Sequence, residues 1–255
     1  MDLHYKVEGS GETLVFIHGL SDDLNYWEFL ATHLKRHYQV IRFDLPGHGQ
    51  SELGEDEITL DFYINSLISI LDELNVDTVN LIGFSLGGAI SLDFALKYPE
   101  KVDSLVVMSS FAKVDAHLED IFNGFKQALD RGFEEFYDLI LPMVLCSKVI
   151  DNNRDELEIL KQLASQTANT QAYIKAIDAF SDFNVEKELS KIEIPALILA
   201  GKYDEITPVD IQEDICDNIH NSKLIVFDDV RHNLLVGENN NKILDILKEF
   251  LKNKM

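Results

Sequence analysis

The sequence predicts an α/β protein with a mostly parallel, twisted sheet flanked by helices. Apolar runs of strand length alternate with amphipathic helical runs, which is typical of parallel strands joined by crossover helices. The central apolar runs are continuous, as expected for strands that are covered on both faces. The alternation stops between residues 113 and 189, where the sequence favours helices alone. We therefore expect a helical insertion late in the sheet.

The individual elements follow from the period of the apolar residues. We expect strands at Leu3–Val7, Thr13–His18, Gln39–Phe43, Thr78–Ile82, Ser104–Met108, Ala196–Ala200 and Lys223–Phe227. We expect helices between and after them at Tyr26–Lys35, Leu60–Leu74, Leu86–Tyr98, Pro208–Ile219 and Asn241–Lys252.

The insertion is interpreted as a cap, because helices placed between two sheet strands are expected to lie on top of the sheet. Its expected helices are Ala116–Leu129, Gly132–Leu145, Asp155–Thr167 and Ala172–Phe180. This divides the chain into a core at residues 1–112 and 190–255 and a helical cap at residues 113–189. No flexible linker separates the two parts, so we expect one cooperative unit.

Composition excludes several classes of partner. The net charge of −23 over 255 residues argues against nucleic acid and anionic membranes, because binding to either requires basic surface. No apolar run approaches the roughly 20 residues that span a bilayer, and the first residues lack the apolar region of a secretory signal. Cys146 and Cys216 have no metal-like spacing and are expected to be buried thiols in a reducing compartment. We therefore expect a cytoplasmic protein; its oligomeric state is not indicated.

One five-residue motif is the most specific chemical signal. Gly83-Phe84-Ser85-Leu86-Gly87 lies between an apolar run and a helical run. A strand, a turn with Gly on both sides of a Ser, and then a helix form a nucleophile elbow, which exposes the Ser hydroxyl. Gly is needed at 83 and 87 because a Cβ there would collide with neighbouring backbone. The alternative interpretation is a flexible Gly–Ser loop.

Together with four further motifs, the elbow resembles the α/β-hydrolase superfamily over nearly the whole chain. The resemblance is to its helical-capped carboxylesterase and enol-lactonase branch, and it implies a cap inserted after the sixth family-type strand. Such proteins often begin with one more strand, so we expect a sheet one strand short. The other motifs are Phe16-Ile17-His18-Gly19, Phe43-Asp44-Leu45-Pro46-Gly47-His48-Gly49-Gln50-Ser51, Ile198-Leu199-Ala200-Gly201-Lys202-Tyr203-Asp204 and Val230-Arg231-His232-Asn233.

The resemblance implies a catalytic triad in the chain order Ser85, Asp204, His232. A serine hydroxyl needs a base to remove its proton, and His232 follows the last apolar strand, where the family places its base. Asp204 follows a strand that ends in a Gly turn, and its carboxylate would orient the imidazole. The structural alternatives are a solvated loop histidine and a helix-capping carboxylate.

The remaining site residues are assigned by position. The backbone N–H groups of Leu20 and Leu86 are expected to form the oxyanion hole. We predict substrate contacts from Trp27, Phe84, Phe111 and Met143, and we interpret the segment from Asp44 to Ser51, including His48, as structural. Most cap aromatics are expected to pack the cap onto the core, with a minority facing Ser85. These aromatics are Phe122, Phe125, Phe133, Phe136, Tyr137, Tyr173, Phe180 and Phe183.

The predicted function is hydrolysis of a small to medium carboxylic ester through an acyl-enzyme. The partner is then a small-molecule ester, and activity should rise with pH as the imidazole base becomes neutral. No metal or organic cofactor is implied, because the His residues lack paired-ligand spacing and the Gly-rich turn lacks the Lys of a phosphate loop. Two alternatives stay open. One is the same triad acting on a lactone, a thioester or a C–C bond, and the other is a non-catalytic ligand receptor on the same fold.

Overall fold

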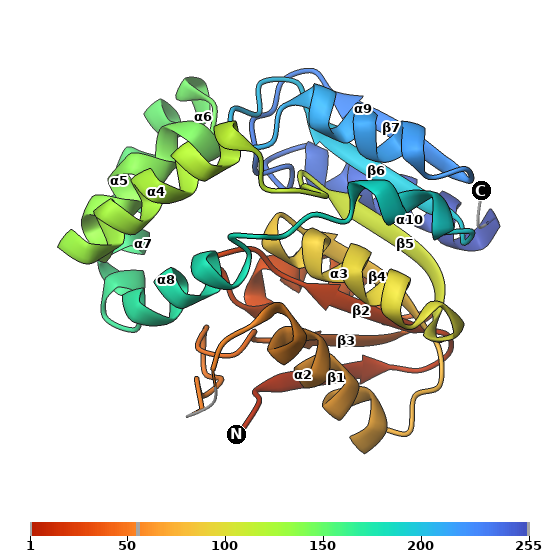
Figure 1. The fold of residues 1–255 in the computed structure, drawn as a ribbon. Coiled ribbons are helices and arrows are strands. Elements are labelled where there is room, and N and C mark those ends of the chain that lie inside the picture. Colours follow the sequence, from red (N-terminus) through yellow and green to blue (C-terminus); the bar gives the residue numbers. More distant parts are fainter. Residues whose placement is uncertain (1, 55–56, 254–255) are drawn as a thin grey trace.

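The computed structural model describes residues 2–54 and 57–253, whose strands form one seven-stranded sheet. The strand order is β1-β3-β2-β4-β5-β6-β7. β1 pairs antiparallel with β3, and all other neighbours are parallel, which confirms the predicted α/β architecture (Figure 1). The strands are β1 (Tyr5–Gly9), β2 (Thr13–Ile17), β3 (Gln39–Phe43), β4 (Val79–Phe84), β5 (Val102–Met108), β6 (Ala196–Gly201) and β7 (Ser222–Phe227).

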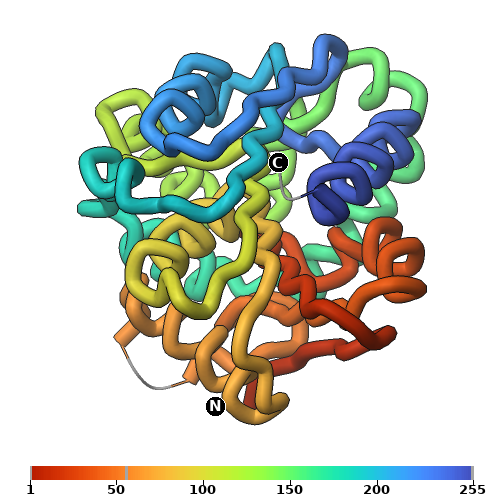
Figure 2. Tube along the Cα trace, turned by 90° about the vertical axis from the view of Figure 1, so that its right-hand side faces the viewer, coloured from red at the N-terminus to blue at the C-terminus, as the bar shows by residue number. Residues whose placement is uncertain are grey.

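Helices cover both faces of this sheet. One face carries α1 (Glu28–Leu34) and α10 (Asn239–Asn253), which lie side by side in Figure 2. The other face carries α2 (Leu60–Glu73), α3 (Leu86–Lys97) and α9 (Val209–Asn218), and α2 and α3 lie in front of the strands in Figure 1. Short 3-10 turns complete the chain at η1 (Leu24–Trp27), η2 (Pro99–Lys101) and η3 (Glu186–Lys191).

The two-sided cover explains why the central strands are apolar throughout. Successive side chains of a strand point to opposite faces. In β2, Val15 and Ile17 join the core beneath α2 and α3, whereas Leu14 and Phe16 join the core beneath α1 and α10. All four are fully buried. An apolar residue is therefore required at each of these positions.

Between β5 and β6 the chain forms five helices, α4–α8, beside the carboxyl ends of the parallel strands (Figure 1). Four correspond to predicted helices, and the short α6 was not predicted. Gly132, expected as the first residue of a helix, instead separates α4 from α5, because its φ of +134° is not helical. The helices are α4 (Ala116–Arg131), α5 (Phe133–Val144), α6 (Ser147–Asn152), α7 (Arg154–Ser165) and α8 (Thr170–Ala179).

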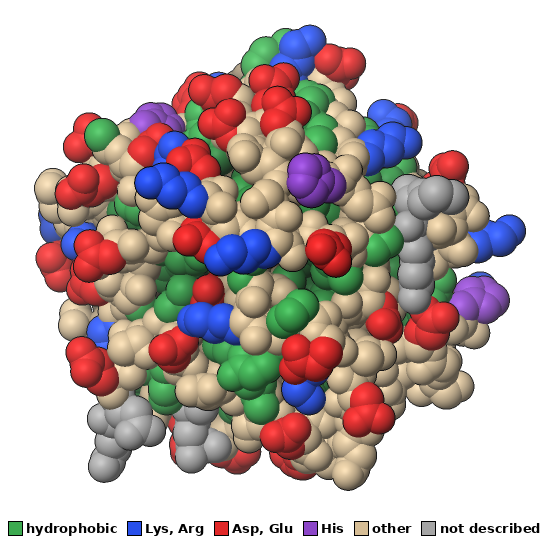
Figure 3. All heavy atoms as spheres, turned by 45° about the vertical axis from the view of Figure 1, so that its right-hand side comes forward, with side chains coloured by type: hydrophobic (Ala, Val, Ile, Leu, Met, Phe, Trp, Pro, Cys, Tyr) green, Lys and Arg blue, Asp and Glu red, His purple; other side chains and the backbone are tan. Residues whose placement is uncertain are grey.

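The surface carries the acidic excess of the chain. Figure 3 shows acidic side chains spread over one face and interspersed with Lys and Arg rather than gathered into one patch. Cys146 and Cys216 are free thiols, but both are half-buried, so the expectation of buried thiols is wrong. No helix in residues 2–54 and 57–253 is long and apolar enough to span a bilayer.

Candidate active site

Ser85 occupies the sharp turn between β4 and α3. Its φ of +52° and ψ of −118° are strained for a residue with a side chain. Neighbouring backbone holds it there: the Ser85 N–H donates to the Met108 carbonyl at 2.9 Å, and its own carbonyl accepts from the Ser110 hydroxyl at 2.6 Å. A Cβ at Gly83 would collide with the carbonyl oxygen of Gly87, and a Cβ at Gly87 would collide with β2. Both glycines are therefore required for the turn.

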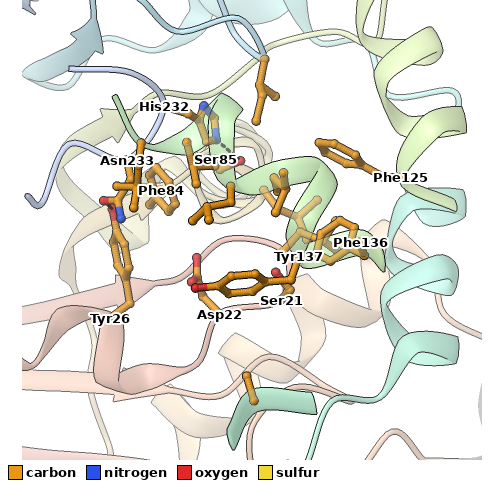
Figure 4. Close-up of a pocket in the computed structure, with 18 of the residues that line it drawn as sticks. Ser21, Asp22, Tyr26, Phe84, Ser85, Phe125, Phe136, Tyr137, His232 and Asn233 are labelled. Atoms are coloured by element: carbon orange, nitrogen blue, oxygen red, sulfur yellow. Dashed lines mark hydrogen bonds between the residues drawn. The ribbon is translucent and has the colours of Figure 1, made fainter. Parts of the chain in front are cut away.

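The structure brings the three predicted triad residues together. The Ser85 hydroxyl lies 2.9 Å from Nε2 of His232 (Figure 4). Nδ1 of His232 lies 2.8 Å from Oδ2 of Asp204. His232 follows β7 and Asp204 follows β6, so parallel strands deliver both to the same sheet edge as Ser85. Asp204 and His232 are only 5% and 3% exposed.

The hydrogen-bond partners of Asp204 favour its charged form. Its Oδ1 accepts from the backbone N–H groups of Ile206 and Thr207, and its Oδ2 accepts from the Thr207 hydroxyl at 2.8 Å. Burial acts to raise the pKa of Asp204, but the charge of His232 and the hydrogen bonds from His232 and Thr207 outweigh it. The pKa of Asp204 is therefore lowered. An ionised Asp204 accepts the Nδ1–H of His232 and leaves Nε2 free to act as a base.

A buried histidine orients the first predicted oxyanion donor. The Leu45 N–H donates to Nε2 of His18 at 2.9 Å, so Nδ1 carries the proton and donates to the Gly19 carbonyl at 2.8 Å. Burial lowers the pKa of His18, consistent with this neutral ring. The same trans peptide carries the Leu20 N–H, which points away from the carbonyl. Leu20 and Leu86, the two predicted donors, both line the pocket that contains Ser85.

That pocket has a volume of about 380 Å³ and lies between the strand ends and helices α4, α5, α7 and α8. Aromatic side chains of the inserted helices make up much of its wall. We expected a minority of eight such residues to face Ser85; instead five do so, namely Phe122, Phe125, Phe133, Phe136 and Tyr137. Phe180 and Phe183 pack against Phe111, and Tyr173 packs against His48.

Two of the four predicted substrate contacts line the pocket and two do not. Phe84 and Phe111 are part of its wall. Trp27 is fully buried against Phe16 of β2, with ring centroids 5.0 Å apart, so it belongs to the core beneath α1. Met143 of α5 is partly buried, packs against the core and is not part of the pocket wall. The predictions for Trp27 and Met143 are therefore wrong.

Tyr26 and Asn233 line the pocket, although we did not predict them as site residues. The Tyr26 hydroxyl donates to Oδ1 of Asn233 at 3.1 Å, and the Tyr26 ring stacks on Phe84 at 4.6 Å. The Asn233 N–H donates to the Val144 carbonyl of α5 at 3.1 Å, which ties the loop of His232 to the inserted helices. The sequence could have indicated Asn233 as a site residue, because it directly follows His232. No feature of the sequence indicated Tyr26.

Asp22 is a third residue of the site that the sequence did not predict. It lies in the loop after β2, is half-buried, and lines the pocket (Figure 4). The pKa of the Asp22 carboxyl is raised to about 7, mainly because the group is buried and also because Asp23 is negatively charged. The charge of His232 and a hydrogen bond from the backbone of Gly19 act in the opposite direction. The sequence shows only two adjacent acids in a loop, which is a common surface pattern.

The segment around Asp44 forms a tightly bonded loop outside the pocket. The carboxylate of Asp44 accepts hydrogen bonds from the backbone N–H groups of Leu24 and Gln50 at 2.7 and 2.8 Å. His48 is fully buried, its Nδ1 lies 3.1 Å from the Pro46 carbonyl, and burial lowers its pKa to about 3. Within the described part of the chain, no group of three His, Cys, Asp or Glu residues could hold a metal ion.

Comparison with known proteins identifies the family and the fold. A family model described as alpha/beta hydrolase fold matches residues 12–156. The proline iminopeptidase of Saccharolobus solfataricus is 29% identical over 97% of this chain and 87% of its own length. The pimeloyl-[acyl-carrier protein] methyl ester esterase of Aliivibrio fischeri is 27% identical over 98% of this chain and 97% of its own. The crystal structure of the enol-lactonase from Burkholderia xenovorans LB400 superposes with a TM-score of 0.90 at 20% identity, covering 98% of this chain and 96% of that one.

Proposed function

The chain belongs to the α/β-hydrolase family and is a hydrolase, and on that premise we propose that it cleaves carboxylic esters through an acyl-enzyme. One observation carries the proposal. Two consecutive hydrogen bonds, of 2.9 and 2.8 Å, link the Ser85 hydroxyl to His232 and His232 to Asp204 at the base of an apolar pocket. This is the arrangement that activates a serine for attack on a carbonyl carbon.

In the acylation half, Oγ of Ser85 attacks the ester carbonyl carbon while Nε2 of His232 takes the hydroxyl proton. Asp204 stays ionised, holds the Nδ1–H and stabilises the imidazolium. The carbonyl oxygen becomes an oxyanion, which the N–H groups of Leu20 and Leu86 bind; each such donor contributes on the order of 3 kcal/mol. Leu86 begins α3, whose dipole adds positive potential at that point. The C–O bond then breaks, and His232 gives its proton to the leaving alcohol.

The deacylation half repeats these steps with water. Neutral His232 takes a proton from water, the hydroxide attacks the acyl carbon, and a second oxyanion forms at the same donors. Collapse of this intermediate breaks the bond to Ser85, which regains its proton from His232, and the free acid leaves. The aromatic wall binds the apolar part of the substrate throughout, because it removes that surface from water.

The choice of an ester over a C–C bond rests on the site and on one relative. The site offers two backbone donors and one acid–base residue, which suffice for ester cleavage. The Aliivibrio fischeri relative, similar over 98% of this chain, is named a methyl ester esterase. A lactone would pass through the same steps, with the leaving alcohol still joined to the acyl group.

The test uses the hydrolysis of p-nitrophenyl butyrate and labelling by a fluorophosphonate probe. We expect Ser85→Ala to abolish both while the circular dichroism spectrum is unchanged, and mass spectrometry of the labelled wild type to place the adduct on Ser85. Ser66→Ala is the matched control, because Ser66 lies on α2 and its hydroxyl bonds to the Phe62 carbonyl away from the pocket. Turnover retained in Ser85→Ala would contradict the proposal. A folded wild type that is never labelled would favour the ligand-receptor alternative instead.

A further inference from the structure

The pocket has a one-sided distribution of charge. Among the described residues that line it, Asp22 is the one carboxyl group, and Lys and Arg are absent. The other titratable side chains of the wall are already engaged: Tyr26 donates to Asn233, Tyr137 donates to the Leu157 carbonyl, and His232 is held by its triad partners. A negatively charged group of a substrate would find no cationic side chain here.

The carboxyl of Asp22 is available to a substrate. Among the described residues no side chain hydrogen-bonds to it, and only the backbone of Gly19 does so. Asp22 lies two residues beyond Leu20, and its own N–H points back to the Gly19 carbonyl at 3.4 Å. Figure 4 shows the carboxyl directed into the pocket on the side facing Ser85 and His232. A group bound next to Asp22 would therefore lie close to the reacting carbonyl.

The rest of the wall also suits a positive charge. Phe84, Phe125, Phe136 and Tyr137 line the pocket with aromatic rings, whose faces attract cations. An anionic carboxyl in a mostly apolar cavity attracts a cation more strongly than it would in water, because the effective dielectric constant is lower. Both features favour the same class of ligand.

We propose that Asp22 determines the charge specificity of this pocket, which takes esters carrying a positively charged group such as a quaternary ammonium. The inference rests on the proposed ester hydrolysis and adds to it the class of substrate. Asp22 acts through its charge and does not take part in the transfer of protons to or from Ser85.

The preference should depend on pH, because the Asp22 carboxyl is neutral below and ionised above its pKa of about 7. Between about pH 6 and about pH 8.5 its ionised fraction rises about tenfold. Titratable groups surround it on several elements. Asp23 is adjacent in the loop, Tyr26 lies on η1, Tyr137 on α5, Tyr173 on α8, and His232 follows β7.

The experiment compares two substrates of the same shape. One is the p-nitrophenyl ester of γ-(trimethylammonio)butyrate, and the other is its uncharged isostere, in which a tert-butyl group replaces the trimethylammonium group. The measured quantity is the ratio of kcat/KM for the charged ester to that for the neutral ester. The trimethylammonium charge is fixed, so any change of the ratio with pH belongs to the protein.

In the wild type we expect this ratio to rise about tenfold between about pH 6 and about pH 8.5. In Asp22→Asn, which keeps the size of the side chain, we expect a flat ratio that is about tenfold below wild type at the higher pH. Any contribution of His232 is present in both proteins. Asp23→Asn is the matched control: it removes a neighbouring charge that does not line the pocket, and it should keep the rise.

An Asp22→Asn variant with the wild-type ratio at both pH values would overturn the proposal. The dissociation constants of the two esters, measured on Ser85→Ala with and without Asp22→Asn, separate this outcome from failure of the proposed function. If the wild type hydrolyses neither ester, ester cleavage is wrong. Tighter binding of the charged ester that depends on Asp22 would still support the charge specificity, and its absence would refute it.

Discussion

A carboxyl held in a mostly apolar pocket must cost the folded protein stability once it ionises. Asp22→Asn removes the ionisation and keeps the size of the side chain. Burial raises the pKa of Asp22 from 3.8 to about 7 in the folded state. The folded protein therefore retains a proton at pH values where the unfolded chain has lost it, so stability falls as pH rises from about 4 to about 7. Above this range the loss is complete.

The magnitude follows from the two pKa values. Their difference corresponds to an upper limit of about 4 kcal/mol. Water can enter the pocket and solvate the carboxylate in part, so we expect about 2 kcal/mol. The free energy of unfolding of Asp22→Asn, relative to wild type, should increase by this amount between about pH 4.5 and about pH 8.

Urea denaturation followed by circular dichroism at a series of pH values measures this difference directly. Groups that titrate elsewhere, such as His48, are present in both proteins and cancel in the comparison. Asp23→Asn should keep most of the pH dependence of the wild type, displaced to somewhat lower pH, since burial of Asp22 is unchanged and only the smaller contribution of the Asp23 charge is lost. A stability difference between Asp22→Asn and wild type that does not change across this pH range would refute the argument that folding raises the pKa of Asp22.

Two further predictions concern the triad and the elbow. Asp204→Asn should lower kcat for p-nitrophenyl butyrate by roughly 10³–10⁴, because an amide no longer fixes the His232 tautomer; a near-normal kcat in the folded variant would argue against this role. Gly83→Ala should destabilise the fold by about 3 kcal/mol or more in urea denaturation, because its Cβ meets backbone. Gly124→Ala, in α4 with open space around it, should gain about 1 kcal/mol and serves as the control; equal effects would refute the steric argument.

Much of the fold could be predicted because local patterns and global packing agree. A buried parallel strand needs apolar side chains on both faces, and this requirement is visible as the continuous apolar run 14–17. We expected Gly132 to begin a helix because the sequence around it continues in a helical period. In the structure its φ of +134° is not helical, so α4 ends before it and α5 begins after it. The short α6 contains too few residues to show a period.

The triad residues were predictable because each follows a strand in a recognisable turn. Ser85 lies more than a hundred residues before Asp204 and His232 in the chain, yet parallel strands place the loops that carry all three at one edge of the sheet. Trp27 and Tyr26 show the limit of this reasoning. They are adjacent aromatics in one 3-10 turn, and only packing decides that Trp27 enters the core while Tyr26 faces the pocket.

Asp22 was not predictable for a related reason. Its significance depends on the absence of Lys and Arg among the described residues that line the pocket, and the sequence does not show which residues those are. An ionised Asp22, which lines the same pocket as Leu20 and Ser85, opposes the negative charge that develops on the carbonyl oxygen during attack by Ser85. A neutral ester leaves this repulsion in place at high pH, whereas a cationic ester brings a charge that offsets it. If Asp22 selects cations, binding of the correct substrate also removes an obstacle to the reaction, so the preference should be expressed in kcat as well as in KM.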